Sequence, residues 1–320
     1  MTRFVHMPTY SHSQLETFLQ CRLKYKFKYI DRIKVPVAKS VELFLGDVVH
    51  QTFKFLYDGV VKKTVFPKSI VLEQFDKTWD SLWTADIGIV RDKTATDYRD
   101  MGRQFLEQFY DVYFPFDQFE IVGLETNDRY VLVDGNQYYV RIDKLGKSAD
   151  GTFYVCDYKT NNKLKTEDEL KKDRQLAMYA LWVRQKYPSA KTVKLVWYFV
   201  AHNKRFEIEH SQQDLSRIEQ TTVDVIKEIA ACKDFPANPG RLCDWCEYKS
   251  ICPAWNPGIA SDLTATNSRV IGGALSGGTI SVSESRIGAA QKKKSDGGET
   301  IIGVDSGAKK KTKQQRLDFF

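Results

Sequence analysis

Long hydrophobic runs are missing from this sequence of 320 residues. No apolar stretch approaches the roughly 18 residues that a membrane-spanning helix needs. The N-terminal residues also lack an apolar stretch like that of a secretory signal. We therefore expect a soluble, cytoplasmic protein without a membrane partner. Disulfides are rare in that compartment, so the six cysteines favour metal binding instead.

Two further absences concern the class of enzyme and local order. The sequence has no Gly-x4-Gly-Lys-Ser/Thr loop, which excludes a P-loop motor. It also has no aromatic residue between Asn256 and Asp318, a stretch that is rich in glycine and serine and carries two lysine triplets. Such a segment cannot bury enough apolar surface to offset the entropy lost on ordering. We therefore predict a disordered basic linker over residues 259–312.

Residues 1–258 have the pattern of one folded domain. Of the whole chain, 42% of the residues are hydrophobic and 13% are aromatic, which is enough for a sizeable core. The net charge of +7 is compatible with a nucleic-acid partner but is weak evidence alone. Helical patterns come first, followed by a meander of strands and then by further helices and a strand. This order predicts a mixed α/β fold.

Hydrophobic periodicity predicts the individual elements. Helices are expected near 41–58, 68–83, 96–113, 167–187 and 213–232, and strands near 119–126, 130–133, 138–145, 152–160 and 193–200. Ser13-Gln-Leu-Glu16 matches a capping box that would start a helix. Residues 22–29 alternate basic and apolar side chains, which suggests a strand, whereas the cap before them favours a helix.

Two carboxylates and a lysine form a candidate active site. Asp157 and Lys159 end an apolar strand and alternate with Tyr158, so their side chains should point to one face. A hairpin through Asp150 and Gly151 would bring Asp143 beside Asp157. Such a pair suits Mg²⁺ or Mn²⁺, and a neighbouring lysine can orient water or stabilise developing negative charge. A surface hairpin with ordinary charges is the alternative interpretation.

Three more polar residues lie in helical patterns. His50 follows Gly46 by four residues within a long apolar helix pattern. Gln175 and Tyr179 are also four residues apart and should share one helix face. Taken alone, His50 reads most simply as a core histidine, and the other two as ordinary core or surface positions.

Four of the six cysteines form a candidate metal site: Cys21, Cys243, Cys246 and Cys252. Four soft ligands suit either zinc or an iron–sulfur cluster. Zinc sites usually combine two paired hooks, whereas the first of these cysteines stands alone in the sequence. Cys156 and Cys232 are left over. Cys156 alternates with Asp157 along a strand and should face the core as a small hydrophobic residue.

In order and spacing, these motifs resemble the PD-(D/E)XK nuclease superfamily. Within it they are most similar to the RecB-like branch, which includes CRISPR-associated Cas-four-type exonucleases and phage relatives. The matching elements are Ser11-x-Ser13 through Cys21, Gly46-x-x-x-His50, Arg141-Ile-Asp143, Asp157-Tyr-Lys159-Thr160, Gln175-x-x-x-Tyr179 and the cysteine cluster. They span residues 11–253. The sequence departs from the family pattern at Val140, Ile142 and Asp157, where relatives often have glycine, proline and glutamate, but no ligand is lost.

The resemblance implies a fold and a set of catalytic residues. The fold is a restriction-endonuclease-like core, with a central mixed sheet flanked by helices, a helical insertion and an iron–sulfur staple. His50, Asp143 and Asp157, together with the Tyr158 carbonyl, would hold Mg²⁺ or Mn²⁺, and Lys159 would serve the attacking water. Two further residues would position DNA or the lysine: Gln175 and Tyr179. Glu125 lies on the strand before the hairpin, where relatives often carry a glutamate.

The resemblance also favours a [4Fe-4S] cluster over Zn²⁺ at the four cysteines. Its expected role is structural, because it would tie the first helix to the C-terminal part of the domain and close a long loop.

Residues 313–320 resemble peptides that bind sliding clamps. The residues that would make the contacts are Gln314, Leu317, Phe319 and Phe320. In such peptides the glutamine hydrogen-bonds at a pocket rim while the apolar side chains fill the pocket. A chance apolar terminus is the alternative interpretation.

We therefore expect a metal-dependent DNA exonuclease that acts on single-stranded or frayed ends, with the 5′ to 3′ polarity of many relatives. Replication, recombination or repair would be its setting, with a sliding clamp or another replisome protein as partner and a separate helicase for unwinding. If a phage encodes it, the host cytoplasm is its compartment. Two alternatives remain open: a non-catalytic DNA-binding adaptor at the clamp, and a structure-specific flap or junction endonuclease.

Overall fold

The computed structural model describes residues 8–35, 39–89 and 93–257. Its helices are α1 (His12–Gln20), α2 (Arg22–Tyr25), α3 (Val41–Val61), α4 (Lys68–Leu82), α5 (Ala95–Tyr113), α6 (Glu167–Lys171), α7 (Arg174–Lys186) and α8 (Gln212–Ala231). A π-helical turn (Lys26–Ile30) continues α2, and short 3-10 turns lie at Val200–His202, Arg241–Trp245 and Lys249–Ile251. Among these described helices, none is long and apolar enough to cross a membrane.

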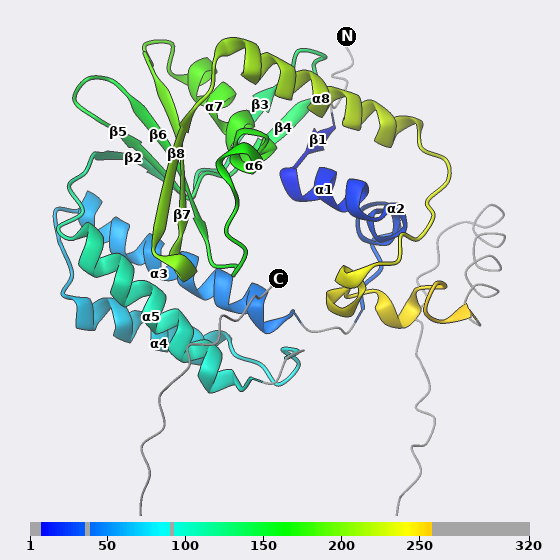
Figure 1. The fold of residues 1–320 in the computed structure, drawn as a ribbon, viewed down its shortest axis with the longest axis horizontal. Coiled ribbons are helices and arrows are strands. Elements are labelled where there is room, and N and C mark those ends of the chain that lie inside the picture. Colours follow the sequence, from blue (N-terminus) through cyan, green and yellow to red (C-terminus); the bar gives the residue numbers. More distant parts are fainter. Residues whose placement is uncertain (1–7, 36–38, 90–92, 258–320) are drawn as a thin grey trace, which may run out of the picture. The chain divides into compact units, whose positions relative to one another are not determined.

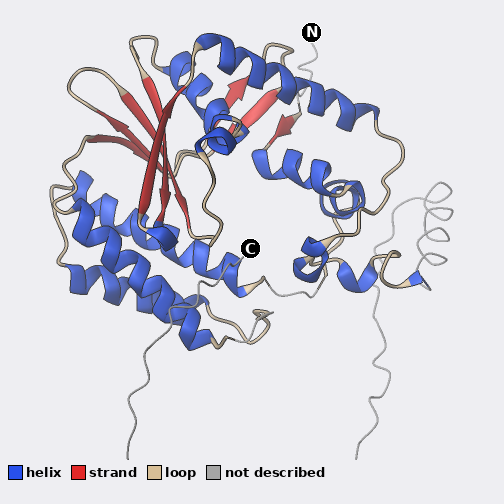
Figure 2. Ribbon diagram, in the orientation of Figure 1, coloured by secondary structure: helices blue, strands red, loops and turns tan. Residues whose placement is uncertain are grey.

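The strands form two sheets (Figures 1 and 2). The larger one has the order β2-β5-β6-β7-β8 and consists of β2 (Glu120–Leu124), β5 (Lys144–Lys147), β6 (Phe153–Lys159), β7 (Val193–Phe199) and β8 (Lys204–Glu209). It is mixed, because β6 and β7 run parallel whereas the other neighbours are antiparallel. The smaller one has the order β1-β4-β3 and consists of β1 (Thr9–Tyr10), β3 (Asp128–Val131) and β4 (Gln137–Val140). The mixed sheet with flanking helices confirms the predicted fold class.

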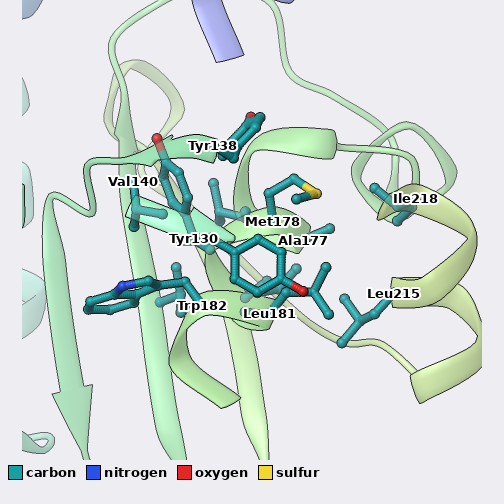
Figure 3. Close-up of a cluster of buried hydrophobic side chains, with 14 of the residues drawn as sticks. Tyr130, Tyr138, Val140, Ala177, Met178, Leu181, Trp182, Leu215 and Ile218 are labelled. Atoms are coloured by element: carbon teal, nitrogen blue, oxygen red, sulfur yellow. The ribbon is translucent and has the colours of Figure 1, made fainter. Parts of the chain in front are cut away.

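Alternation along the central strands divides the core into two parts. Cys156 and Tyr158 of β6 are buried against α3, α4 and α5, whereas Val155 is buried on the opposite face with α7 and α8. Cys156 is therefore a core residue, as its alternation with Asp157 predicts. Figure 3 shows part of the second core, in which side chains of the smaller sheet meet α7 and α8: Tyr130, Tyr138, Val140, Ala177, Met178, Leu181, Trp182, Leu215 and Ile218.

Most elements appear where periodicity predicts them, with four differences. The expected helix at 167–187 is two helices, because Asp173 accepts a hydrogen bond from the Leu176 amide and caps α7. The expected strand at 138–145 is also two, β4 and β5, which belong to different sheets. Strands β1 and β8 were not predicted. The predicted capping box at Ser13 is wrong: the N-cap of α1 is Ser11, whose hydroxyl accepts from the Gln14 amide.

The ambiguous segment 22–29 is helical, as α2 and the π-turn. Its basic and apolar side chains alternate, but Tyr25 and Phe27 are the buried ones, and Tyr25 packs edge-on against Phe18 of α1. Tertiary packing of these rings, rather than the period of the sequence, decides the conformation.

Candidate active site

One cleft of about 1030 Å³ is lined by every residue predicted for catalysis or for binding Mg²⁺ or Mn²⁺. These are His50, Asp143, Asp157, Tyr158, Lys159, Gln175 and Tyr179. They come from α3, the end of β6, the residue before β5, and the first two turns of α7. Residues more than 100 positions apart in the sequence thus meet at one end of the central strands.

The register of β5 on β6 brings the two carboxylates together. Lys144 is paired with Cys156 in this antiparallel ladder, so Asp143 lies opposite Asp157. The backbone N–H of Tyr158 donates a 2.9 Å hydrogen bond to Oδ2 of Asp143. Asp143 is therefore oriented by the strand that carries Asp157, as the predicted hairpin requires.

Asp157 and Lys159 share one face of β6. The Lys159 Nζ lies 2.7 Å from Oδ2 of Asp157 and also donates to Oε1 of Gln175 at 3.1 Å. Burial raises the pKa of Asp157 to about 6, although the adjacent lysine partly opposes this. Burial also disfavours the charge on Lys159, but the carboxylates of Asp157 and Asp173 outweigh it and raise the lysine pKa above its ordinary value. Lys159 is thus a fixed cation at neutral pH.

His50 enters the cleft from α3. Its Nε2 donates to the Tyr158 carbonyl at 2.8 Å, and its Nδ1 lies 3.4 Å from Oδ2 of Asp143. Burial alone would lower the pKa of His50, but the Asp143 carboxylate raises it to about 9. Burial likewise opposes ionisation of Asp143, yet His50 holds the pKa of that carboxyl below its ordinary value. A divalent cation would therefore have to displace a proton from His50 to bind either ring nitrogen.

Glu125 lies beside His50 and Asp143, although it is distant from both in the sequence. One ligand atom from each of His50, Glu125 and Asp143 lies within 4.8 Å of the others. Glu125 follows β2, and its N–H donates to the Asp143 carbonyl at 3.0 Å. Its φ of 44° lies in the left-handed region, which residues other than glycine seldom adopt. Such conformations cluster at functional sites. Arg141 holds its carboxylate through a 2.8 Å contact.

Tyr179 and His12 also line the cleft. Tyr179 lies one turn after Gln175 on α7, and burial raises its pKa to about 12. His12, which sequence analysis did not select, opens α1 and lines the cleft. Burial lowers the pKa of His12 to about 4, so this ring is neutral at pH 7. The one signal for it in the sequence is its place inside the Ser11-x-Ser13 motif.

Lys144, next to Asp143, was not singled out by the sequence either. Its side chain is fully buried among aromatic rings, and its Nζ lies 3.9 Å from the ring centroid of Tyr57 and 5.0 Å from that of Tyr198. Burial lowers its pKa to about 8. Aromatic faces attract such a cation, which anchors the residue beside the Asp143 carboxylate.

All four predicted cysteine ligands line a single cavity of about 180 Å³. The cavity lies between α2 and the segment after α8, which are joined by hydrogen bonds from Leu23 N to the Pro236 carbonyl and from Asn238 to the Gln20 carbonyl. Phe27 and Tyr248 also pack together across this junction. The remaining cysteines, Cys156 and Cys232, do not line the cavity. The structure therefore brings the distant Cys21 to the C-terminal cluster.

Comparison with known proteins places these features in a family. The family model of the PD-(D/E)XK nuclease superfamily matches residues 9–253. No curated protein is similar enough to count as a match.

Two solved structures are similar to this chain at low sequence identity. A crystal structure from Eubacterium rectale, described as a "putative exonuclease", has a TM-score of 0.42 and 13% identity, over 73% of this chain and 91% of that one. A crystal structure of a protein named SSO0001 has a TM-score of 0.31 and 18% identity, over 76% of this chain and 93% of that one.

Proposed function

The chain belongs to the PD-(D/E)XK nuclease superfamily, and we propose that it is a metal-dependent DNA exonuclease acting on single-stranded ends. The observation that carries the proposal is the meeting of Asp143, Asp157 and Lys159 in one cleft with His50. Two carboxylates, an imidazole and a fixed ammonium group form a donor set that suits a hard divalent cation beside a phosphate.

The residues that would hold the cation are His50, Asp143, Asp157 and the Tyr158 carbonyl, with Glu125 as a further carboxylate. Bound Mg²⁺ or Mn²⁺ would polarise the scissile phosphate and lower the pKa of the attacking water. Lys159 supplies a positive charge that Asp157 and Gln175 orient, and this charge stabilises the negative charge that develops on the phosphate. Tyr179 and Gln175 of α7 would position the nucleic acid and the lysine.

A degradation assay with end-labelled DNA tests this proposal. We expect linear single-stranded DNA to be degraded from an end with Mg²⁺ or Mn²⁺, and not with EDTA. The position of the label that is released first gives the polarity, which we propose to be 5′ to 3′. Cleavage of circular single strands would instead indicate the flap or junction endonuclease. Binding without cleavage under every metal condition would indicate the adaptor.

We further propose that the four cysteines hold a [4Fe-4S] cluster. Tetrahedral zinc with Zn–S bonds of about 2.3 Å needs sulfurs about 3.8 Å apart. Within the described ranges, however, no three cysteine sulfurs lie within 4.8 Å of one another. The wider spacing and the cavity of about 180 Å³ support a larger group than a single ion. Absorbance near 400 nm after anaerobic purification, with iron and sulfide analysis, would distinguish the cluster from zinc.

The proposed clamp peptide and the linker before it lie outside the described residues. For residues 313–320 we propose that Gln314, Leu317, Phe319 and Phe320 contact a sliding clamp, with residues 259–312 as a tether that raises the local concentration of nuclease there. Unwinding would come from a separate helicase, in replication, recombination or repair. Deletion of residues 314–320 should abolish clamp pull-down and leave hydrolysis of free oligonucleotides unchanged. Retained pull-down would refute the peptide's role.

A further inference from the structure

A second cavity adjoins the catalytic cleft. It has a volume of about 360 Å³, within the range of small-molecule sites. Residues that line both cavities are Glu42, Leu43, Tyr158, Lys159 and Thr160. Its further lining includes Tyr98 and Met101 of α5 and, just after β6, Asn161 and Asn162. The cavity therefore begins at the proposed catalytic lysine and continues away from it between α3, α5 and the segment after β6.

Apolar side chains form one part of this second cavity. Leu43 projects from the first turn of α3 at the junction of the two cavities, and 63% of its surface is exposed. Met101 and the ring of Tyr98 add apolar surface from α5, and Lys93, whose Nζ lies 3.3 Å from the Met101 sulfur and 5.8 Å from the Tyr98 ring centroid, adds a cation beside them. A leucine that covers no core and stands where the cleft meets a recess of mixed apolar and polar lining is suited to contact a flat, apolar ligand surface. The face of a nucleobase is such a surface, and bases bind to apolar and aromatic side chains in this way.

Glu42 supplies an acceptor without a partner. Its Oε1 accepts a 2.9 Å hydrogen bond from the Tyr98 hydroxyl. Its Oε2 is buried, and no hydrogen-bond partner for this oxygen is found among the residues that the structure describes. A buried carboxylate oxygen accepts readily from the amino or ring N–H groups of a base. The exposed side chains of Asn161 and Asn162 add amide groups that both donate and accept.

We propose that this second cavity, here called the base pocket, binds the nucleobase of the nucleotide that adjoins the scissile phosphate. The proposal rests on the proposed nuclease function, because it is the phosphate beside Lys159 that places a base at Leu43. Leu43 supplies the contact with the face of the base, and Glu42 accepts from its edge. The pocket explains why α3 carries an exposed leucine and an unpaired buried carboxylate oxygen in its first turn.

Kinetics on strands that lack one base test the proposal. The substrates are identical linear single strands, each with one abasic nucleotide at a successive position from the labelled end. For the full-length wild-type chain we expect kcat/KM to fall about tenfold when the abasic nucleotide adjoins the scissile phosphate. In the Leu43→Ala variant, the same abasic nucleotide should lower kcat/KM by less than about twofold. Leu19→Ala is the matched control, because Leu19 is 47% exposed on α1 and lines neither cavity. Equal cleavage of all strands by the wild type would overturn the base pocket and leave the nuclease function standing.

A binding measurement makes the test independent of cleavage. The Asp157→Asn variant with Ca²⁺ would be titrated with strands that carry fluorescent 2-aminopurine at successive positions. A rise in fluorescence at one position, as the base leaves the stack of its neighbours, supports the pocket even if no DNA is cut, provided that it is lost when Leu43→Ala is added and kept with Leu19→Ala. Absence of this rise at every position overturns it. Failure of the wild type to cut any strand, with the rise preserved, would refute the nuclease function alone.

Discussion

Gly46 of α3 approaches Thr160 so closely that a β-carbon at position 46 would lie 3.2 Å from the Thr160 hydroxyl oxygen. Thr160 directly follows Lys159 at the end of β6, and Gly46 lies one helical turn before His50. The absence of a side chain at Gly46 therefore allows α3 to lie against the end of β6. This contact sets the reach of His50 towards the Tyr158 carbonyl and Asp143.

We predict that Gly46→Ala lowers kcat on the order of tenfold, because a shift of a few tenths of an ångström misplaces His50. Thermal stability should not fall, since alanine is favoured over glycine in a helix by about 1 kcal/mol. The double variant Gly46→Ala/Thr160→Ala should be more active than the double variant Gly46→Ala/Thr160→Ser. The serine keeps the hydroxyl that meets the new β-carbon, whereas the alanine removes it. Gly88→Ala is the control, because a β-carbon there meets nothing within 4 Å. Full activity of Gly46→Ala would show that the close contact is not needed.

Removing one carboxylate tests the position of the metal. Asp143→Asn should reduce cleavage by at least about 100-fold, because it removes a charge from the ligand set that His50 and Glu125 share. Calorimetry should show weaker Mn²⁺ binding. The melting temperature without metal should also fall, because the variant loses the pair between Asp143 and His50. Asp111→Asn is the control, because this exposed carboxylate pairs with Lys68 and neither residue lines the cleft. Unchanged Mn²⁺ affinity in Asp143→Asn would place the metal elsewhere.

The cysteine cavity should contribute to stability rather than to chemistry. Cys243→Ala should lose the absorbance near 400 nm and lower the melting temperature by about 10 °C, since it releases the C-terminal segment from α2. DNA binding should weaken before hydrolysis does. Cys156→Ala is the control: this cysteine is buried in the core away from the cavity, so its removal should leave the absorbance intact. If Cys243→Ala retained both the absorbance and the melting temperature, Cys243 would not be a ligand of the cluster; a wild-type protein without this absorbance would hold no cluster.

Lys144 should make stability depend on pH in the alkaline range. Its pKa is about 8 in the folded chain against an ordinary value of 10.5. Between these two values the unfolded chain binds more protons than the folded one, so the free energy of unfolding should rise as the pH rises from about 8 to about 10.5. The gain is on the order of 3 kcal/mol.

Urea denaturation in EDTA checks this contribution by difference. Lys144→Met lacks the titrating group, so the gain of the wild type relative to this variant should appear between pH 8 and pH 10.5, the window set by the two pKa values. Tyrosines that titrate near pH 10 affect both proteins alike and cancel in the comparison. A constant difference in stability across this window would mean that Lys144 does not change its charge there.

Much of the fold could be predicted from local sequence signals. The apolar periods of α3, α4, α5 and α8 are visible in the sequence, because each helix buries one stripe of side chains. The split at Asp173 was missed, since a single capping side chain inside a continuous helical pattern leaves no periodic signal. The split between β4 and β5 was also missed. The backbone leaves one sheet and enters the other within three residues, and the apolar pattern continues across this point.

The sequence by itself determined the types of ligand and their order along the chain: histidine, paired carboxylates, lysine and cysteines. Those features depend on residue chemistry and on spacing within single elements, which are local properties. Only the tertiary structure decided that Glu125 lies beside Asp143 and His50, that Lys144 is buried among aromatic rings, and that Cys21 lines the cavity of the C-terminal cysteines. These relationships depend on strand register and on helix packing between distant segments, and no single segment of the sequence specifies either.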